Sequence, residues 1–438
     1  MGELQIGKSA ALFARATKVL PGGNSRTTVW SSPHPVYAAS GEGCWLTDVD
    51  GNRYLDLLNN YTSLLHGHAH PAIMEAVTQR LPLGTAFPLP TETEIELAEL
   101  LCSRVQSFDH VRFANSGSEA VMIALKAARA RTGRPKIAKC EGAYHGSYDF
   151  AEVSLDSSPE TWGNAEPRSV PYSHGTPQGV LDNVVVIPFN RSGEAERILR
   201  ANAGDLACVL VDPMPNRGGL IPAQRGYLEM LRRVTSECGM LLIFDEVISF
   251  RLDHAGAQGV FGVDPDLTTL AKIIGGGFPI GAIAGTADAM AVFDPRHGKP
   301  LAPHGGTFNA NPVSMVAGKM AMELMIPAEF TRLNALGQRI RDGIADAFAK
   351  TGIDGQVTGA GSLFRILMTS ARLVDYRTAQ AANAQAPALE RVVAFLRDNG
   401  ILIAGTGLGA LSTPMGDAEV DLFVDIFTNA LEREAALQ

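Results

Sequence analysis

TTLAKIIGGGFPIG, residues 268–281, places one lysine, Lys272, at the end of an apolar run, with two isoleucines between it and three consecutive glycines. A lysine that only faces solvent requires no such surroundings. In open α/β sheets, ligands bind outside the carboxyl ends of the strands, and a lysine in that position would meet them. The segment therefore raises the hypothesis of a lysine-containing site at the edge of a sheet.

Short apolar runs alternate with helical patterns through the middle of the chain. The runs are KIAKC (136–140), NVVVIPF (183–189), ACVLVDP (207–213) and MLLIFDE (240–246). Near-continuous hydrophobicity of this length is typical of strands covered on both faces, as in a parallel sheet. The helical patterns at 118–133 and 226–239 each end at a glycine suited to a C-cap. We therefore predict an α/β domain over residues 60–310.

The remainder of the chain has a different pattern. Residues 330–352 have the periodicity of a long amphipathic helix, and GSLFRILMT (361–369) is typical of a strand. At 438 residues the chain is long enough for two domains. We predict a smaller α+β domain over residues 311–438, which the N-terminal segment, residues 1–59, joins.

Composition excludes several classes of partner. The formal net charge of −9 and the pI of about 5.6 argue against nucleic acid or an anionic membrane, which favour a basic face. The five cysteines form no CxxC pair, which favours free thiols in a reducing cytoplasm. Residues 1–20 have the pattern of an amphipathic helix rather than of a signal peptide. No window approaches the roughly 18 apolar residues of a membrane span.

Two acids, Asp245 and Glu246, stand at the end of the predicted strand 240–246. Acidic turn residues commonly end strands, so this observation alone does not require a site. The stretch DPDLTTLAK (264–272), however, has the pattern of a second strand and ends at Lys272. An acid and an amine at neighbouring strand ends are expected to face one pocket.

Two further segments supply groups for the same edge. In NSGSEA (115–120), Ser116, Gly117 and Ser118 precede a helix, whose free amides and dipole favour an anion such as phosphate. A simple N-cap is the alternative reading of this segment. In CEGAYHGSYDF (140–150), Tyr144 and His145 follow another strand and offer aromatic faces, although a buried or rim aromatic residue remains open.

A turn suited to phosphate, aromatic faces, an acid and an amine together match what pyridoxal 5′-phosphate (PLP) needs. Proteins hold this cofactor through a lysine Schiff base, with an acid beside its pyridine nitrogen. From residue 20 to residue 421 the chain resembles the class III aminotransferases of fold type I, in the branch of glutamate-1-semialdehyde aminomutase and the β-amino-acid aminotransferases. The motifs that carry this resemblance, in the family's order, are DVDGNRYLD, GHAHP, NSGSEA, YHG, FDEVIS, LAKIIGGG and HGGTFNANP.

The resemblance implies roles for the site residues. Lys272 would form the Schiff base and then move a proton, and Asp245 would pair with the pyridine nitrogen. Tyr144 and Val247 would lie on opposite faces of the ring. The other cofactor-binding residues would be Ser116, Gly117, Ser118 and His145, with the amides of Gly117 and Ser118 on the phosphate. Glu246 would serve the structure rather than the chemistry.

The resemblance also implies a homodimer with a shared active site. Gly306 and Thr307, in HGGTFNANP, resemble the segment that reaches the phosphate from the other subunit. The glycines after Lys272 are expected to let the chain pass close to the cofactor without obstruction.

Substrate choice is less defined. Arg26, in PGGNSRTT, lies where β-amino-acid aminotransferases place an arginine for the substrate carboxylate, although a surface arginine is the alternative. Several relatives carry an arginine in the late loop where this chain has Thr406, which leaves 2-oxoglutarate as acceptor in doubt. We hypothesise that Arg217, in DPMPNRGG, takes over carboxylate binding, with a surface ion pair as the alternative.

These observations predict a PLP-dependent aminotransferase that moves an amino group from a carboxylated amine of β-amino-acid type to a keto acid. Glutamate-1-semialdehyde 2,1-aminomutase is the alternative within the class, and a non-catalytic PLP-fold protein is a distant one. We expect no metal site at His66, His68 and His70, because no second cluster of ligands completes one. IIGGGFPIG lacks the glycine spacing of a dinucleotide site, so an NAD enzyme is disfavoured.

Overall fold

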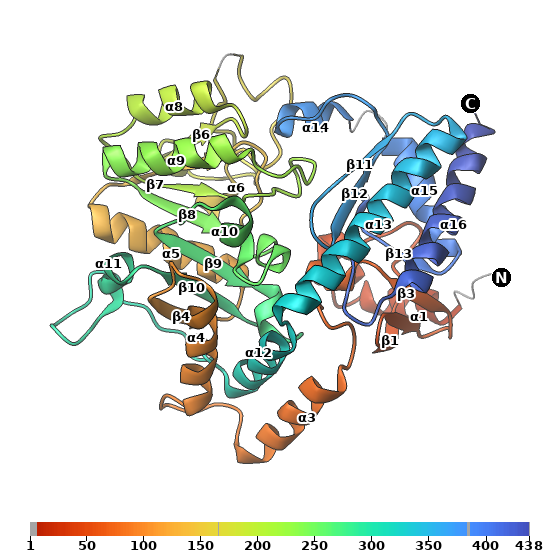
Figure 1. Cartoon of the computed structure of the whole chain (residues 1–438), viewed down its shortest axis with the longest axis horizontal. Helices are drawn as coiled ribbons and strands as arrows, with labels where there is room; N and C mark the ends of the chain where they lie inside the picture. Colours follow the sequence, from red (N-terminus) through yellow and green to blue (C-terminus); the bar gives the residue numbers. More distant parts are fainter. Residues whose placement is uncertain (1–6, 165, 383–385, 438) are drawn as a thin grey trace.

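The computed structural model describes residues 7–164, 166–382 and 386–437, and its largest element is a seven-stranded sheet (Figure 1). The strand order is β4-β10-β9-β8-β7-β5-β6. Strand β10 is antiparallel to β4 and β9, and the neighbouring pairs from β9 to β6 are parallel. The bounds are β4 His110–Ala114, β5 Lys136–Cys140, β6 Val184–Ile187, β7 Leu206–Val211, β8 Leu241–Asp245, β9 Leu267–Ala271 and β10 Gly281–Gly285. The predicted α/β fold is confirmed.

Helices cover both faces of this sheet, which explains its continuous apolar strands. In β7, Val209 and Val211 belong to the apolar core beneath α8 (Ser192–Ala201) and α9 (Arg225–Cys238). Their neighbours Cys208 and Leu210 belong to a second core, against α5 (Gly117–Thr132). Because alternate side chains of a strand point to opposite faces, both sets must be apolar.

The predicted helix ends are confirmed. Helix α5 ends at Gly133 and α9 at Gly239, and both glycines adopt the left-handed conformation with φ values of 69° and 65°. Glycine enters this region without the steric cost that a Cβ brings, which is why it ends helices so often. The predicted strand 136–140 coincides with β5, whereas the other three predicted runs each extend past the end of their strand by one or two residues.

Two smaller sheets lie on the other side of the molecule (Figure 1). One joins β1 (Ala38–Glu42), β2 (Trp45–Asp48) and β3 (Arg53–Asp56) to β13 (Ile401–Leu402), which runs parallel to β3. The other contains β11 (Gln356–Thr358), β12 (Leu363–Leu367) and β14 (Leu408–Ala410). The helices of this side are α13 (Pro327–Thr351), α14 (Tyr376–Ala382), α15 (Ala386–Asp398) and α16 (Asp417–Ala435).

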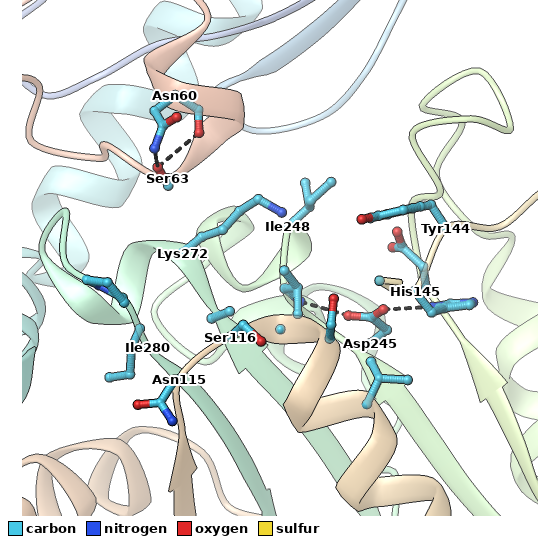
Figure 2. Close-up of a pocket in the computed structure, with 18 of the residues that line it drawn as sticks. Asn60, Ser63, Asn115, Ser116, Tyr144, His145, Asp245, Ile248, Lys272 and Ile280 are labelled. Atoms are coloured by element: carbon cyan, nitrogen blue, oxygen red, sulfur yellow. Dashed lines mark hydrogen bonds and ion pairs between the residues drawn. The ribbon is translucent and has the colours of Figure 1, made fainter. Parts of the chain in front are cut away.

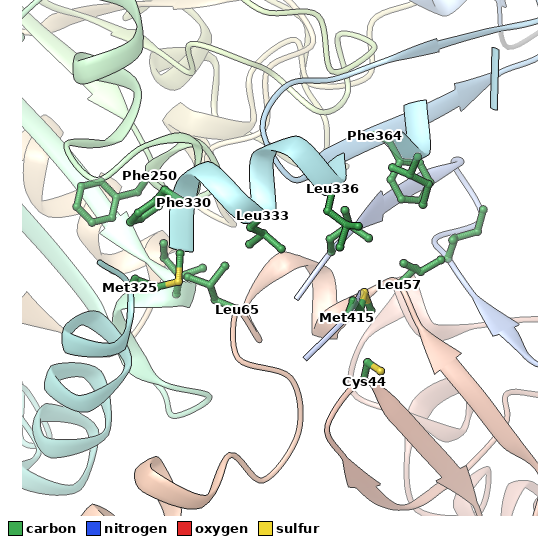
Figure 3. Packing of buried hydrophobic residues seen from close by; sticks show 14 of the residues in the cluster. Cys44, Leu57, Leu65, Phe250, Met325, Phe330, Leu333, Leu336, Phe364 and Met415 are labelled. Atoms are coloured by element: carbon green, nitrogen blue, oxygen red, sulfur yellow. The ribbon is translucent and has the colours of Figure 1, made fainter. Parts of the chain in front are cut away.

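One apolar core connects the two sides of the molecule. Figure 3 shows Leu333 and Leu336 of the predicted long helix, α13, beside Leu65 and Leu57 of the N-terminal third. The same core takes in Phe250, which follows β8. Beneath the main sheet it includes residues of α3 (Pro71–Arg80), α4 (Glu92–Arg104) and α12 (Pro312–Leu324). The domain boundaries at residues 60 and 311 stay a prediction.

The remaining helices are short. They are α1 (Gly7–Ala16), α2 (Asn59–Thr62), α6 (Asp149–Glu152), α7 (Gln178–Leu181), α10 (Gly256–Phe261) and α11 (Ala287–Met290). The predicted N-terminal helix is described from residue 7 onward, and its first six residues lie outside the described part. Within the described ranges, no helix combines the length and apolar character needed to cross a bilayer.

Candidate active site

A cavity of about 370 Å³ lies at the carboxyl edge of the main sheet (Figure 2). The segments that follow β4, β5, β8 and β9 meet around it, as expected for a ligand site in an open α/β sheet. It is lined by Asn60, Ser63, Asn115, Ser116, Gly117, Ser118, Val121, Tyr144, His145, Gly146, Asp212, Asp245, Val247, Ile248, Ala271, Lys272, Gly277, Phe278, Pro279 and Ile280. Eight of the predicted site residues (Ser116, Gly117, Ser118, Tyr144, His145, Asp245, Val247 and Lys272) therefore share one cavity.

Lys272 is the first residue after β9, and its backbone is strained. Its φ of 52° lies in the left-handed region, which is unfavourable for a residue with a Cβ. Such strain persists only where the surrounding structure fixes it, and it is concentrated at functional sites. Burial lowers the pKa of the Lys272 amine, while Asp245 and Asp212 act in the opposite direction. An amine with a lowered pKa is neutral more often near pH 7 and can accept a proton.

Asp245 ends β8 and is held by three hydrogen bonds. Its Oδ2 lies 2.7 Å from Nδ1 of His145. Its Oδ1 accepts from the hydroxyl of Thr269 and from the amide of Val247, both at 3.1 Å. These contacts come from three different segments, so they fix the orientation of the carboxylate within the cavity.

His145 has the buried position that was one of the two sequence-based readings. The chain was expected to offer its ring as an aromatic face, but the buried ring is edge-on to Asp245 through the Nδ1 contact (Figure 2). Its Nε2 is also buried and has no hydrogen-bond partner among the described residues. Burial lowers the pKa of His145 despite the adjacent carboxylate. We therefore assign His145 to the orientation of Asp245 rather than to ring stacking.

Tyr144 and Val247 both line the cavity. Tyr144 is about half exposed and follows β5, with a side chain that Figure 2 places above His145. Val247 packs near Gly117, where an added Cβ would lie 3.2 Å from a Val247 methyl group. The two positions are compatible with the predicted contacts on opposite faces of a ring, which stay a prediction.

The N-terminus of α5 supplies the expected anion site. Ser116 is its N-cap, and the Ser116 hydroxyl accepts a hydrogen bond from the Glu119 amide at 3.2 Å. The first amides of a helix have no partner within the helix, and here they belong to Gly117 and Ser118, which both line the cavity. The N-cap reading is therefore confirmed by the Ser116 side chain. The anion-site reading stays a prediction, which the backbone amides at this helix end allow.

Asp212 is a site residue that the sequence analysis did not single out. It directly follows β7, is buried and lines the cavity, with Oδ1 accepting a hydrogen bond from the Met214 amide at 2.8 Å. Burial, and then the charge of Asp245, raise its pKa well above the usual value. The sequence contained the signal, because Asp212 stands at the end of an apolar run just as Asp245 does.

A left-handed turn covers the cavity from the other side. Residues Asn59, Asn60, Tyr61 and Thr62 have φ values of 49°, 47°, 56° and 70°. The turn places Asn60 and Ser63 across the cavity from Ser116 and Asp245 (Figure 2). Arg26 is exposed, and its Nη1 donates to Asn60 Oδ1 at 2.8 Å. Arg26 itself is not among the lining residues, but it binds one of them.

Three predicted residues lie at other cavities. Gly306 and Thr307 line a space of about 600 Å³ together with residues 85–91. Arg217 lines a different cavity, which Thr406 also lines, and its Nη2 lies 2.6 Å from Asp156 Oδ1. The roles predicted for these residues stay predictions.

The structure gives the glycines after Lys272 a different reason from the one expected. Of the three, only Gly277 lines the cavity. Gly276 has a φ of 58°, and a Cβ there would lie 2.4 Å from the Ala317 carbonyl oxygen in α12. Close packing against α12 and a left-handed backbone, rather than passage beside a ligand, therefore require glycine at 276.

Glu246, His66 and His68 have hydrogen-bond partners of their own outside the cavity. Glu246 accepts from the Ala257 amide at 2.6 Å and from the Gln258 side chain at 2.8 Å, in keeping with a structural role. The ring of His66 contacts the Ala321 carbonyl and the Thr413 hydroxyl, and His68 pairs with Asp56. Among the described residues, no group of three or more His, Cys, Asp or Glu side chains is arranged to hold a metal ion.

Comparison with known proteins identifies the family. The model of aminotransferase class III matches residues 27–431. The chain belongs to the class III aminotransferases. It is 55% identical to an omega-transaminase from Sphaerobacter thermophilus of known structure, with a TM-score of 0.95 over 98% of this chain and 97% of that one.

Two other relatives carry different names. A glutamate-1-semialdehyde 2,1-aminomutase from Methanothermobacter thermautotrophicus is 42% identical over 86% of this chain and 87% of its own. The solved β-phenylalanine aminotransferase of Variovorax paradoxus is 32% identical, with a TM-score of 0.88 over 98% of this chain and 95% of that one. The chain is therefore a PLP-dependent enzyme of the aminotransferase and aminomutase family, and one of its structural relatives has been solved with PLP bound.

The residues around the cavity fit PLP. The Lys272 amine matches the aldehyde of the cofactor, and the Asp245 carboxylate, held by three hydrogen bonds, matches its pyridine nitrogen. The free amides of the helix end match the phosphate, and the exposed tyrosine matches the ring. The identification as an enzyme of this family sets aside the non-catalytic alternative.

Proposed function

We propose that this class III enzyme transfers the amino group of a β-amino acid, or of a similar carboxylated amine, to a keto acid. The observation that carries the proposal is the hydrogen bond from Arg26 to Asn60, which lines the cavity opposite Asp245. It brings a guanidinium to the mouth of the cavity, and a planar guanidinium binds a carboxylate bidentately. The β-phenylalanine aminotransferase relative adds support for a β-amino acid as donor.

The residues of the cavity divide the work in this proposal. PLP, when bound, supplies an electron sink for the substrate carbon. Lys272 is the covalent attachment point and afterwards carries a proton to or from the substrate carbon. Asp245, oriented by His145 and Thr269, holds the pyridine nitrogen in its protonated form. The amides of Gly117 and Ser118 receive the phosphate, which the helix dipole favours.

A donor and acceptor panel tests the substrate class. Holoenzyme is supplied with β-phenylalanine, β-alanine, α-phenylalanine or a simple amine, each with pyruvate or 2-oxoglutarate. The proposal predicts the highest kcat/KM with a β-amino acid. Arg26→Ala should lower kcat/KM for carboxylated donors by roughly 10- to 150-fold, as for a lost charge-assisted contact, and leave the simple amine much less affected. Arg15→Ala, at an exposed arginine of α1, is the control.

The aminomutase reading is retained because a relative with 42% identity carries that name. An aminomutase needs no second substrate, since both halves of its cycle act on one carbon skeleton. Incubation of holoenzyme with glutamate-1-semialdehyde alone separates the two functions. If the enzyme moves the amino group of this compound from C2 to C1 faster than it reacts with any donor and acceptor pair, the aminomutase function replaces the transaminase proposal.

We infer that two chains form a homodimer in which each completes the other's site. The space lined by Gly306 and Thr307 also has exposed apolar side chains, those of Phe87, Leu89 and Phe308. Apolar residues gathered in this way are typical of an interface. Light scattering should give twice the chain mass. Lys272→Ala and Thr307→Asp should each be inactive alone. In dimers that contain one chain of each variant, one of the two sites should be active.

Two coarser features complete the proposal. We infer that residues 1–59 belong with residues 311–438 as the smaller domain, because the Leu55 amide donates to the Gly400 carbonyl at 2.8 Å and the Ala410 amide to Leu57 at 2.6 Å. Limited proteolysis should then release fragments with ends near residues 60 and 310.

We also infer a cytoplasmic location from the five free cysteines, which suit a reducing compartment.

A further inference from the structure

A second cavity, of about 360 Å³, lies between the loop after β7 and the three-stranded sheet of β11, β12 and β14. Residues from six segments line it, among them Asp156, Arg217, Arg365, Tyr376, Glu390 and Thr406. None of these residues lines the cavity of Lys272. The second cavity contains two arginines, one buried and one half exposed, which differ in their partners.

Arg365, on β12, is a buried cation without a nearby acid. Its side chain is 7% exposed, and it donates through Nε to the Thr406 carbonyl at 3.2 Å and through Nη1 to the Asn216 carbonyl. No Asp or Glu oxygen of the described residues lies within ion-pair distance. Burial, and then the charge of Arg217, lower its pKa to about 10. A buried charge without a counter-ion is costly, and an entering anion would offset that cost.

The buried Arg251 shows what a purely structural arginine looks like in this chain. Its Nε, Nη1 and Nη2 each donate to a separate acceptor, and it lines no cavity described here. Arg365 uses only Nε and Nη1 and leaves Nη2 without a described partner, at the wall of a cavity. This difference marks Arg365 as a donor that is available to a ligand.

Arg217 has a partner that it can exchange. Its ion pair with Asp156 joins side chains that are 36% and 54% exposed. Ion pairs between exposed groups contribute little to stability, so a ligand carboxylate can replace Asp156 at low cost. Glu390 is the other acid at the cavity, and its side chain lies on an exposed stretch of α15.

The two cavities adjoin through the loop after β5. The ring of Tyr376, which lines the second cavity, packs directly on Gly142, where a Cβ would lie 1.9 Å from a ring carbon. Tyr144, two residues further along this loop, lines the first cavity. Likewise, Asp212 and Arg217 lie in one loop and line the first and the second cavity respectively.

We propose that Arg365, with Arg217, forms a carboxylate-binding site in the second cavity. The site rests on the proposed function in one respect, because it would read the distal carboxylate of a dicarboxylic substrate of the transaminase. Arg365 reaches the backbone of Thr406, so it delivers a guanidinium to the late loop that lacks an arginine of its own. A fork of two N–H donors suits a planar carboxylate. A separate carboxylate ligand would have the same chemistry, and the experiment distinguishes the two sources.

The test is titration calorimetry of the holoenzyme with glutarate, a dicarboxylate that does not react, and with butyrate, its monocarboxylate counterpart. Arg365→Met should lower the ratio of glutarate to butyrate affinity by roughly 10- to 150-fold. Thr406→Asp, which leaves Arg365 in place and supplies an internal carboxylate, should lower the ratio in the same direction. Arg131→Ala removes an exposed ion pair with Asp288 outside both cavities, and is the control with an unchanged ratio.

Competition identifies the source of the carboxylate. Glutarate that is competitive with the keto acid marks the site as a substrate subsite, and glutarate that binds through Arg365 without competing marks a separate ligand site. An unchanged ratio in both Arg365→Met and Thr406→Asp would overturn the proposal. Because glutarate does not react, this result would stand whether or not the transaminase proposal holds. If Arg365→Met fails to fold, Thr406→Asp alone decides.

Discussion

Nδ1 of His145 lies 2.7 Å from Oδ2 of Asp245, and both side chains are buried at the floor of the cavity. Together with the two hydrogen bonds on Oδ1, the contact fixes the orientation of the carboxylate at the cavity. It also connects the segment after β5 to the end of β8, two strands separated in the sheet by β7. The acid of the site is therefore positioned by side chains from two directions rather than by its own strand alone.

Asp245→Asn should lower the rate of transamination by several orders of magnitude. The substitution removes the negative charge that keeps the pyridine nitrogen protonated, and such electrostatic effects on a transition state are typically large. Single-turnover kinetics with a saturating amine donor measure the effect, and PLP affinity should change much less than the rate. A variant that keeps near-parental rates would require the acid to be reassigned, with the adjacent Asp212 as the next candidate.

Arg217→Ala should weaken the apparent affinity for 2-oxoglutarate by roughly 10- to 150-fold, with smaller effects on pyruvate and on an uncharged amine donor. Asp156→Asn provides the matched variant, because it releases Arg217 from its ion pair and should raise the affinity for 2-oxoglutarate instead. Steady-state kinetics with the three substrates measure both. Equal losses for all three substrates, or none, would mean that Arg217 does not bind carboxylates.

His66 should make the folded state sensitive to acid. Burial lowers its pKa from 6.5 to about 4, while its ring contacts the Ala321 carbonyl and the Thr413 hydroxyl. Because the unfolded chain binds the proton more tightly, the stability due to neutral His66 is complete above pH 6.5 and is lost as the pH falls toward 4. The total effect is about 3 kcal/mol.

Denaturant unfolding at a series of pH values measures this loss. In His66→Gln the slope of stability against pH between 6.5 and 4 should become shallower, whatever the absolute stability of the variant. His297→Gln, outside this apolar core, is the control. A parental slope in His66→Gln would assign the acid sensitivity to other groups.

Gly276→Ala should destabilise the protein by more than about 1 kcal/mol, because the new Cβ would meet the Ala317 carbonyl and the backbone is left-handed. Gly226→Ala is the control, since Gly226 lies in α9 with open space around its Cα. That change should stabilise by about 0.4–1 kcal/mol. Thermal unfolding compares the two, and equal shifts would contradict the role given to α12.

The sequence predicted those parts of the site that follow one local rule. Asp245, Lys272 and the segment 116–118 each stand at the end of a strand or the start of a helix, and the sheet brings such ends together. The same rule applied to Asp212 would have found it as well. The turn at residues 59–62 has no comparable signal, because left-handed conformations of residues other than glycine depend on their tertiary surroundings.

Arg365 was beyond prediction for a related reason. Its sequence context, LFRIL, indicates a strand and nothing more. Only the pairing of β12 with β14 brings it to Thr406, and only the loop after β7 brings Asn216 and Arg217 to the same cavity. Such long-range contacts carry no local pattern. The contact of His145 with Asp245 had no local signal either, because the distance between the two depends on strand order.

The central claim is that Lys272 carries the cofactor, and borohydride reduction of the PLP-loaded enzyme followed by peptide mapping tests it most directly. The reduction makes the bond between lysine and cofactor permanent. The account predicts the added mass on the peptide that contains Lys272, and its loss in Lys272→Ala. Lys139 is the informative comparison, because it is also buried at the main sheet but donates its Nζ to the Val153 carbonyl, away from the cavity. Cofactor mass on Lys139 or on any other lysine, with Lys272 unmodified, would contradict the account.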